Sequence, residues 1–152
     1  MPRLLEIFCI ARRFMAANGN PNQWTNGYPS IETIENDINS GESYVVEKGD
    51  KIVATFVVKE GKEPAYDKIR DGKWPNNHTY ATIHRVASDG EAKGVLHLSL
   101  QFAKSNHTDI RIDTHIDNKV MQHLLAKEGF KYCGVVSYGP GAERLAYQWS
   151  NG

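Results

Sequence analysis

The chain lacks the features that mark secreted, disulfide-bonded and membrane-spanning proteins. Its 152 residues include only two cysteines, Cys9 and Cys133, and both lie in apolar stretches, which predicts buried free thiols instead of a disulfide framework. No apolar run approaches the roughly 20 residues that a membrane span needs, and the N-terminal residues do not resemble a signal peptide. We therefore expect a cytoplasmic protein without a membrane partner.

An excess of charge of one sign is also missing, because 18 basic residues are balanced by 18 acidic ones. Proteins that bind nucleic acid usually carry a basic excess, so no nucleic-acid partner is expected. The six histidines show no H-x-x-x-H spacing and the cysteines no C-x-x-C spacing, so no metal site is predicted. A P-loop nucleotide site is not supported either, since no G-x-x-x-x-G-K-[ST] string occurs.

What remains is the composition of an ordinary globular protein, with 40% hydrophobic and 24% charged residues. The length predicts a single domain over residues 1–152. Periodicity, capping residues and turn residues predict helices over 4–17, 31–39 and 118–128, and strands over 43–47, 51–58, 107–115, 130–138 and 144–149. A long connection over residues 61–77 interrupts this series, and long ordered connections in compact domains are often functional.

The central stretch, residues 80–103, combines a strand, a glycine-containing loop and a helix. Its strand is predicted from Tyr80 to Val86, with Tyr80, Thr82, His84 and Val86 on one face. Helical spacing of apolar residues resumes at Val95. This order of elements is typical of anion binding, because unpaired backbone N–H groups and the helix dipole meet at the start of the helix.

The loop before the helix is the predicted anion site. The backbone N–H groups from Ala92 to Leu96 are the expected ligands, since the first turn of a helix leaves them unpaired. Gly94 lets the backbone approach a phosphate closely. Lys93 either adds a charge-assisted contact or is a solvated surface charge.

The string Glu91-Ala92-Lys93-Gly94-Val95-Leu96 is similar to the pyrophosphate loop of the GCN5-related N-acetyltransferase (GNAT) family, usually written Q/R-x-x-G-x-G/A. Its third and fourth residues fit that pattern, whereas Glu91 and Leu96 depart from it. A second block, residues 110–136, is similar to the family's fifth strand, asparagine-led helix with the pattern N-x-x-M-x-x-x-L-x-K-x-G-F, and sixth strand. The sequence resembles this family over about residues 11–148, and in particular its bacterial members with HRVAS and RIDTH strings.

The resemblance implies an α/β (α+β) fold with a mixed, mainly antiparallel sheet of six to seven strands and about four flanking helices. The family's first strand is expected to be short or absent, since only Met1-Pro2-Arg3 precede the first predicted helix. The implied activity is transfer of an acetyl group from acetyl-coenzyme A (acetyl-CoA) to the amine of a small molecule or to a free amino group. Two alternatives stay open: acetylation of a protein lysine or N-terminus, and a module that binds acyl-coenzyme A without turnover. A homodimer is compatible with either.

The resemblance also implies where the cofactor binds. Main-chain groups at the end of the central strand would pair with the pantetheine arm and direct an N–H group at the developing oxyanion. The asparagine that leads the later helix would contact the cofactor, or act only as the helix cap. The implied cofactor-binding residues are Val86, Ala87, Ser88, Glu91, Ala92, Lys93, Gly94, Val95, Leu96 and Asn118.

Three residues are candidates for acid–base chemistry. Tyr80 occupies the position where several family members place a glutamate base, and His84 lies on the same predicted face. His84 is expected to act as the base or to orient a water molecule, and the alternative is a histidine held in the sheet by hydrogen bonds. His115 is a second acid–base candidate. The tyrosine that many members use to protonate the leaving thiolate corresponds here to Leu125, which cannot donate a proton.

Aromatic side chains are expected to surround the acceptor amine. Trp24 and Tyr28 lie between the first two predicted helices, a segment that lines the acceptor pocket in the family; alternatively, they only cover the core. Trp74 lies close enough in sequence to the central strand to reach the same pocket. Trp24, Tyr28 and Trp74 are therefore the predicted substrate-binding residues, with Tyr66 and Tyr80 nearby.

Overall fold

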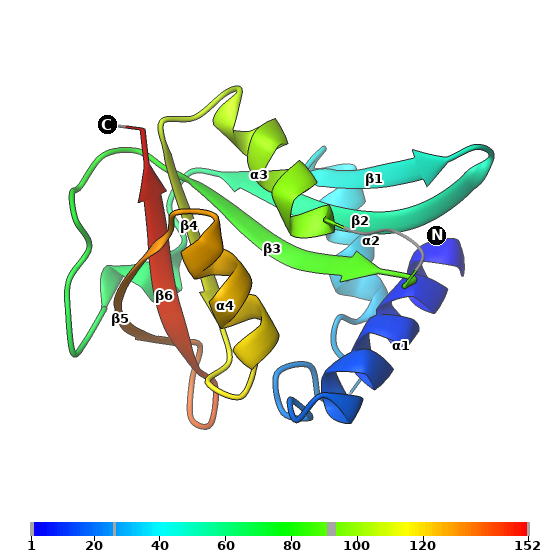
Figure 1. Ribbon diagram of the computed structural model, residues 1–152, viewed down its shortest axis with the longest axis horizontal. Helices are drawn as coiled ribbons and strands as arrows, with labels where there is room; N and C mark the ends of the chain where they lie inside the picture. Colours follow the sequence, from blue (N-terminus) through cyan, green and yellow to red (C-terminus); the bar gives the residue numbers. More distant parts are fainter. Residues whose placement is uncertain (1, 26, 91–93, 152) are drawn as a thin grey trace.

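Six strands form one sheet with helices on both faces (Figure 1). The computed structural model describes residues 2–25, 27–90 and 94–151. Over these residues the elements are α1 (Pro2–Ala17), α2 (Ile31–Asn39), β1 (Ser43–Lys48), β2 (Lys51–Glu60), the 3₁₀-helix η1 (Pro64–Asp67), β3 (Ala81–Ser88), α3 (Val95–Lys104), β4 (Asp109–Thr114), α4 (Lys119–Lys127), β5 (Lys131–Ser137) and β6 (Glu143–Ser150). The strand order is β1-β2-β3-β4-β6-β5, and only β3 and β4 pair in parallel. The predicted mixed, mainly antiparallel sheet with four helices is confirmed, and the described residues contain no strand before α1.

The helices cover the two faces of the sheet in pairs (Figure 1). The buried side chains of α1 and α2 form one cluster with Ala87 of β3: Leu4, Ile7, Phe8, Ala11 and Ile34. On the opposite face, Leu100 of α3 and Leu125 of α4 join the larger core beside Ile83 of β3. These stripes follow the helical periodicity of the sequence, because residues three and four apart share one face of a helix.

Two helices begin at residues whose side chains cap the first turn. Ser30 Oγ accepts the backbone N–H of Thr33 at 3.1 Å at the start of α2. Asn118 Oδ1 accepts the backbone N–H of Met121 at 3.0 Å at the start of α4. Both contacts satisfy donors that the first turn of a helix leaves unpaired.

Both cysteines are free thiols, as predicted. Cys133 is buried, but Cys9 is only partly buried, so the prediction that both are buried is wrong for Cys9. Cys9 lies on α1 beside the stripe that packs on the sheet, whose members are Ile7, Phe8 and Ala11.

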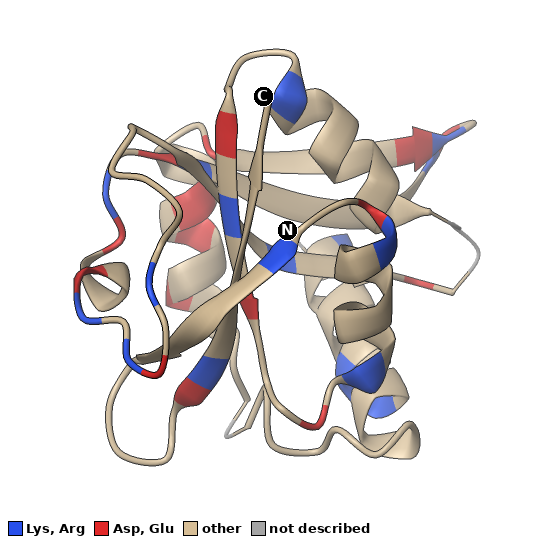
Figure 2. Ribbon diagram, turned by 60° about the vertical axis from the view of Figure 1, so that its left-hand side comes forward, with Lys and Arg blue, Asp and Glu red and all other residues tan. Residues whose placement is uncertain are grey.

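Acidic and basic residues are interspersed around the molecule instead of separated onto opposite faces in the view of Figure 2. This distribution agrees with the equal numbers of the two charges in the sequence. Among the described helices, none has the length and apolar character needed to cross a membrane.

The sheet opens between its two central strands. β3 and β4 pair only at Ala81 with Ile110 and at Thr82 with Arg111, although β3 continues to Ser88. Beyond these two pairs the strands diverge, and Figure 1 shows β1, β2 and β3 running roughly along the long axis of the molecule while β4 and β6 run roughly across it. The two halves of the sheet are therefore separated beyond Thr82, and the space between them, in which cavities lie, is called the opening. α1 lies beside the far end of β3 (Figure 1).

A β-bulge in β3 decides which side chains face this opening. Thr55 pairs with Ala87 but Val57 pairs with His84, so β3 has one extra residue here, and Arg85 has a φ of 50°. The bulge interrupts the alternation of the strand. Val86 therefore packs with the α3 face of the sheet, and the prediction that it shares a face with His84 is wrong.

The connection between β2 and β3 packs against the other half of the sheet. Arg70 forms a two-way backbone bridge with Val135 of β5, with N–H···O distances of 2.9 and 2.8 Å. Gly134 permits this approach, because a Cβ atom there would lie 2.6 Å from the Arg70 carbonyl oxygen. The backbone of the connection is thus anchored on β5.

Farther along the same connection, two rings enclose a buried cation. The Arg111 guanidinium of β4 lies 4.0 Å from the ring centroids of both Trp74 and Tyr80. It also donates hydrogen bonds to Gln148 Oε1 at 2.9 Å and to the Asn76 carbonyl at 3.1 Å. Cation–π contacts with a desolvated guanidinium are stabilising, so the connection is fixed here as well.

A buried carboxylate also holds the connection between β2 and β3 in place. Asp109, at the start of β4, is 2% exposed and accepts hydrogen bonds from Ser150 at 2.6 Å, Asn76 at 3.1 Å and Gln148 at 3.2 Å. Burial raises the pKa of Asp109, but hydrogen bonds, those from Ser150 and Asn76 foremost, outweigh this effect and hold the pKa below its usual value. The ionised form of Asp109 therefore stabilises the folded protein.

Replacing Gly134 by alanine tests the close approach of the connection to β5. We expect Gly134→Ala to lower the free energy of unfolding by about 1–3 kcal/mol, because the new methyl group would overlap backbone atoms of Arg70. Gly139→Ala is the matched control, since Gly139 also has a positive φ, of 137°, but no heavy atom lies within 4 Å of its added Cβ. Urea unfolding of both variants measures the difference; equal losses would contradict the proposed overlap.

Replacing Asp109 by asparagine tests the buried carboxylate. The pKa of Asp109 is lower in the folded protein than in the unfolded chain, where it is about 4. Its carboxylate therefore gives its full stabilisation above about pH 4, and this stabilisation is lost as the pH falls through the folded-state pKa. We expect Asp109→Asn to lower the free energy of unfolding by about 1–3 kcal/mol at neutral pH. The difference in this free energy between the variant and the unaltered protein should become smaller below about pH 4. Urea unfolding at several pH values checks this, with Asp50→Asn in the exposed β1–β2 turn as the control. A difference in the free energy of unfolding that stays constant down to acid pH would contradict a stabilising role of the ionised Asp109 carboxylate.

Candidate active site

Two adjoining cavities occupy the opening between the halves of the sheet. The first, of about 540 Å³, is lined mostly by polar and charged side chains and is called the polar cavity. The second, of about 380 Å³, runs between α1, α4 and the start of α3 and is called the apolar groove. Both are lined by Met15, Val86 and Met121, so they meet at the end of β3.

The apolar groove brings the predicted cofactor-binding residues together. Every one of them that the structure describes lines this groove: Val86, Ala87, Ser88, Gly94, Val95, Leu96 and Asn118. The other three, Glu91, Ala92 and Lys93, lie outside the described residues. Residues that are more than 20 positions apart in the chain thus meet along one surface.

The start of α3 fits an anionic group. Gly94 precedes the helix with a φ of 67°, a left-handed conformation that glycine adopts without strain, and its carbonyl accepts the Leu98 N–H at 3.0 Å. A Cβ at Gly94 would meet no atom within 4 Å, so the space beside it is open. The first-turn N–H groups, from Val95 onward, have no partner within the helix. A diphosphate is the kind of group that such a helix start holds.

The end of β3 fits an extended chain. Ile83, His84 and Ala87 pair with β2 on one side, but among the described strands none pairs with residues 83–87 on the side of the opening. Buried or half-buried backbone N–H and C=O groups need hydrogen-bond partners. A ligand with amide groups can supply them as an added strand does.

Asn118 and Gln23 join the groove to the polar cavity. Besides capping α4, Asn118 donates from Nδ2 to Gln23 Oε1 at 3.0 Å. Gln23 Oε1 also accepts from Thr114 Oγ1 at 3.2 Å and from Asn20 Nδ2 at 3.1 Å. Gln23 lines the polar cavity, and the sequence analysis did not single it out. Its amide fixes the segment after α1 against β4 and α4.

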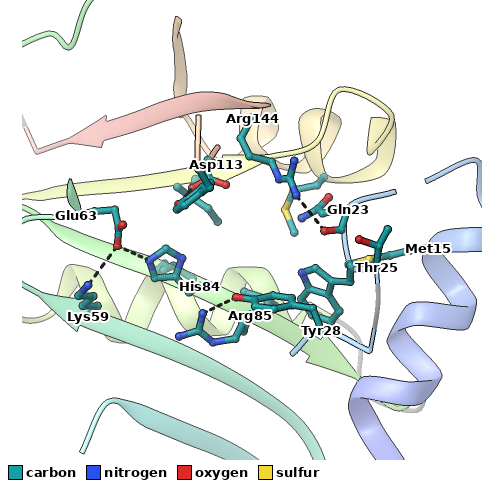
Figure 3. A pocket seen from close by; sticks show the side chains of 16 residues that line it. Met15, Gln23, Thr25, Tyr28, Lys59, Glu63, His84, Arg85, Asp113 and Arg144 are labelled. Atoms are coloured by element: carbon teal, nitrogen blue, oxygen red, sulfur yellow. Dashed lines mark hydrogen bonds and ion pairs between the residues drawn. The ribbon is translucent and has the colours of Figure 1, made fainter. Parts of the chain in front are cut away.

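A histidine and a carboxylate face each other in the polar cavity (Figure 3). His84 Nε2 of β3 lies 3.4 Å from Glu63 Oε2, and Lys59 Nζ of β2 lies 3.2 Å from the same oxygen. The hydrogen bond from His84 lowers the pKa of Glu63 to about 2, with help from Lys59 and against the effect of burial. Glu63 is therefore a carboxylate at all physiological pH values.

Asp113 of β4 holds a second carboxylate at the cavity wall (Figure 3). The hydroxyl groups of Tyr66 and Tyr138 each donate to Asp113 Oδ2 at 2.6 Å. Burial, and then the Asp113 charge, raise the pKa of Tyr66 and of Tyr138 well above the usual value for tyrosine. Both phenols keep their protons and orient the Asp113 carboxylate.

The bulge residue Arg85 anchors the other wall. Its guanidinium donates to both oxygens of Asp37 of α2 at 2.7 Å and to the Tyr28 hydroxyl at 2.8 Å. The Trp24 ring packs edge-on against Tyr28, with centroids 6.4 Å apart. Trp24 and Tyr28 both line the polar cavity, the location that the sequence analysis expects.

Three of the predicted site residues lie behind the cavities instead of lining them. Tyr80 is buried and its hydroxyl accepts the backbone N–H of Glu63 at 2.9 Å. Trp74 donates from Nε1 to the Tyr66 carbonyl at 2.8 Å. His115 Nδ1 accepts the Asp117 N–H at 3.0 Å, and burial, followed by the charge of Arg144, lowers the pKa of His115. Tyr80 and Trp74 thus position Glu63 and Tyr66.

Leu125, at the position of the family's acid, is fully buried in the core.

Besides Gln23, the sequence analysis did not assign four further charged or phenolic residues to the site, Glu63, Asp113, Tyr138 and Arg144, which line the polar cavity. They come from the β2–β3 connection, β4, the turn after β5, and β6. No spacing in the sequence links such positions. The length of the connection that carries Glu63 was the one available signal.

Comparison with known proteins places this site in a family. No protein-family model matches the chain, and no curated protein matches it significantly. Among solved structures, an acetyltransferase of the GNAT family from Streptococcus agalactiae is 34% identical, with a TM-score of 0.83 over 99% of this chain and 91% of that one.

More distant solved structures share the fold alone. A GNAT-family acetyltransferase from Listeria monocytogenes is 16% identical, with a TM-score of 0.69 over 97% of this chain and 87% of that one. A ribosomal-protein-alanine N-acetyltransferase from Brucella melitensis is also 16% identical, with a TM-score of 0.60 over 98% and 93%.

An identity of 34% over nearly the whole length shows that the chain belongs to the GNAT family of acetyltransferases. The family resemblance inferred from the sequence is thereby confirmed. The reaction class of this family is acyl transfer.

The pairing of Glu63 with His84 can be tested by NMR. We expect the side-chain carboxyl carbon of Glu63 to show no protonation down to about pH 3 while the protein stays folded, because its pKa is about 2. In His84→Gln the midpoint of Glu63 protonation should rise toward the ordinary pKa of 4.5, and in Lys59→Gln this midpoint should rise less. Protonation of Glu63 near pH 4.5 in the unaltered protein would contradict the pairing.

Proposed function

We propose that this protein transfers an acetyl group from acetyl-CoA to the amine of a small molecule or to a free amino group. The observation that carries the proposal is the His84–Glu63 pair in a polar cavity that adjoins a groove lined by the expected cofactor residues. A base and its orienting carboxylate next to a cofactor groove are the requirements of amine acylation.

The groove supports the choice of cofactor. The start of α3 suits the diphosphate, and residues 83–87 suit the amide groups of a pantetheine arm. When bound, acetyl-CoA supplies the activated acetyl thioester. The groove meets the polar cavity at Val86, so the backbone beside Val86 is the natural donor to the thioester oxygen.

His84 is the proposed base. Its Nε2 faces the Glu63 carboxylate, which favours the tautomer with the proton on Nε2 and a lone pair on Nδ1. Nδ1 takes a proton from the amine, directly or through one water molecule, as the N–C bond forms. His84 then returns this proton to the sulfur as the C–S bond breaks. An acceptor that arrives as an ammonium releases its other proton to solvent before the attack, so protons balance and no separate acid at Leu125 is required.

Tyr138 is not assigned the role of acid. Its raised pKa makes it a poor proton donor, and its hydroxyl already donates to Asp113. Tyr66 and Tyr138 together hold the Asp113 carboxylate toward the cavity, where its charge attracts a cationic amine.

Binding and turnover test this proposal separately. Calorimetry should show that coenzyme A binds and raises the Tm, and thiol release from acetyl-CoA should depend on an added amine. His84→Gln should lower turnover at least tenfold, because a general base is lost, while leaving coenzyme A binding unchanged. His123→Ala, at an exposed position of α4, is the control.

Each failure has a distinct meaning. No binding of coenzyme A would overturn the acyl-transfer account of the groove. Binding without thiol release, for every amine tried, would identify a module that binds acyl-coenzyme A without turnover. An unchanged rate and pH profile in His84→Gln would remove His84 from the mechanism.

A further inference from the structure

The polar cavity contains charges that the protein pairs and charges that it leaves unpaired. Lys59 lies 3.2 Å from Glu63, and Arg85 lies 2.7 Å from Asp37, so these cations have carboxylate partners. Two further charged groups line the same cavity, Arg144 and Asp113. Their surroundings differ from those of the paired groups.

Arg144 is held by neutral acceptors. Its guanidinium donates to the Gln23 carbonyl at 3.0 Å and to the Glu143 carbonyl at 2.8 Å (Figure 3 shows the first contact). Within the described residues no carboxylate lies at ion-pair distance from it. Two of its five N–H groups are thus used to fix its position, and its charge is left without a counter-ion.

Asp113 is the counterpart on the neighbouring strand. Tyr66 and Tyr138 donate to its Oδ2, but among the described residues no cation pairs with it. Asp113 lies opposite Ala146 in the β4–β6 ladder, and Arg144 is two residues away from Ala146 on β6. The wall of the cavity therefore presents one negative and one positive group on adjacent strands.

A ligand that carries both charges matches this wall. We propose that the acceptor is a small amine that also bears a carboxylate, of the amino-acid class, with its carboxylate bound by Arg144 and its ammonium attracted by Asp113 before His84 takes the proton. This inference rests on the proposed acetyl transfer. The planar guanidinium suits a carboxylate, which it contacts through parallel N–H···O bonds.

The same arrangement disfavours the other acceptor classes. A protein lysine has no carboxylate close to its reacting amine, and a diamine would bring a second cation toward Arg144. The remaining lining includes apolar groups, Met15, Trp24 and Met121, which leave room for an apolar amino-acid side chain.

The experiment compares each of the common amino acids with its carboxamide, which keeps the amine and the shape but removes the negative charge. Thiol release from acetyl-CoA gives kcat/KM for each, and calorimetry in the presence of coenzyme A gives acceptor affinity. We expect the unaltered protein to prefer an acid over its amide by roughly ten- to a hundredfold, the effect of one charge-assisted contact.

Arg144→Gln should abolish this preference for the acid. It should lower kcat/KM for the acid, mainly by raising KM, while kcat/KM for the amide stays within about twofold of its value in the unaltered protein. Arg144→Lys, which retains the positive charge, should keep part of the preference for the acid over the amide. Arg13→Gln, at an exposed position of α1, controls for the loss of a surface arginine.

Two results would overturn the inference while the proposed function stands: equal acetylation of acids and amides by the unaltered protein, and an equal loss for both in Arg144→Gln. The second result would mean that Arg144 only holds the Gln23 segment in place. Absence of thiol release with every amine would instead overturn the proposed function, and this inference with it.

Discussion

The separation of β3 from β4 is the constraint on which the rest of the structure depends. Two strands that pair at Ala81 and Thr82 and then diverge leave the main chain of residues 83–87 without a sheet partner on one side. Such backbone groups need hydrogen bonds, and a ligand with amide groups supplies them. The same divergence creates the space for both cavities, and α1, α3 and α4 border it, so the apolar groove and the polar cavity meet at one point.

The β2–β3 connection converts this opening into a site with chemistry. Glu63 reaches His84 because the connection is anchored on the other half of the sheet, through the Arg70–Val135 bridge and the enclosed Arg111 guanidinium. Buried polar groups far from the cavities, such as Asp109, therefore contribute to the position of a side chain inside them. Since a displacement of about 1 Å is enough to spoil proton transfer, this anchoring matters for catalysis as well as for stability.

Some charged residues of the polar cavity are paired within the protein, and others are available to a ligand. Arg85 and Asp37 neutralise each other and hold α2 on the bulge, whereas Glu63 is kept ionised by His84 and Lys59. The phenol of Tyr138 retains its proton because burial and the Asp113 carboxylate oppose its ionisation. What remains is His84 on β3 facing a carboxylate and a guanidinium on the opposite wall, an arrangement suited to the proposed acceptor that carries both charges.

The sequence by itself determined the helices, the strands, their caps and the family. α2 has its predicted bounds, α3 begins at Val95, and Asn118 caps α4, because periodicity and capping depend on residues a few positions apart. It also proposed a set of cofactor-binding residues, and those that the structure describes line one groove. Only the tertiary structure decided which polar side chains meet. His84 faces Glu63 while Val86 turns away, because a bulge breaks the alternation of β3, and Tyr80 and Trp74 pack behind the wall instead of lining it. Glu63, Asp113 and Arg144 converge through strand divergence and the route of a long connection, and neither property is encoded in local sequence spacing.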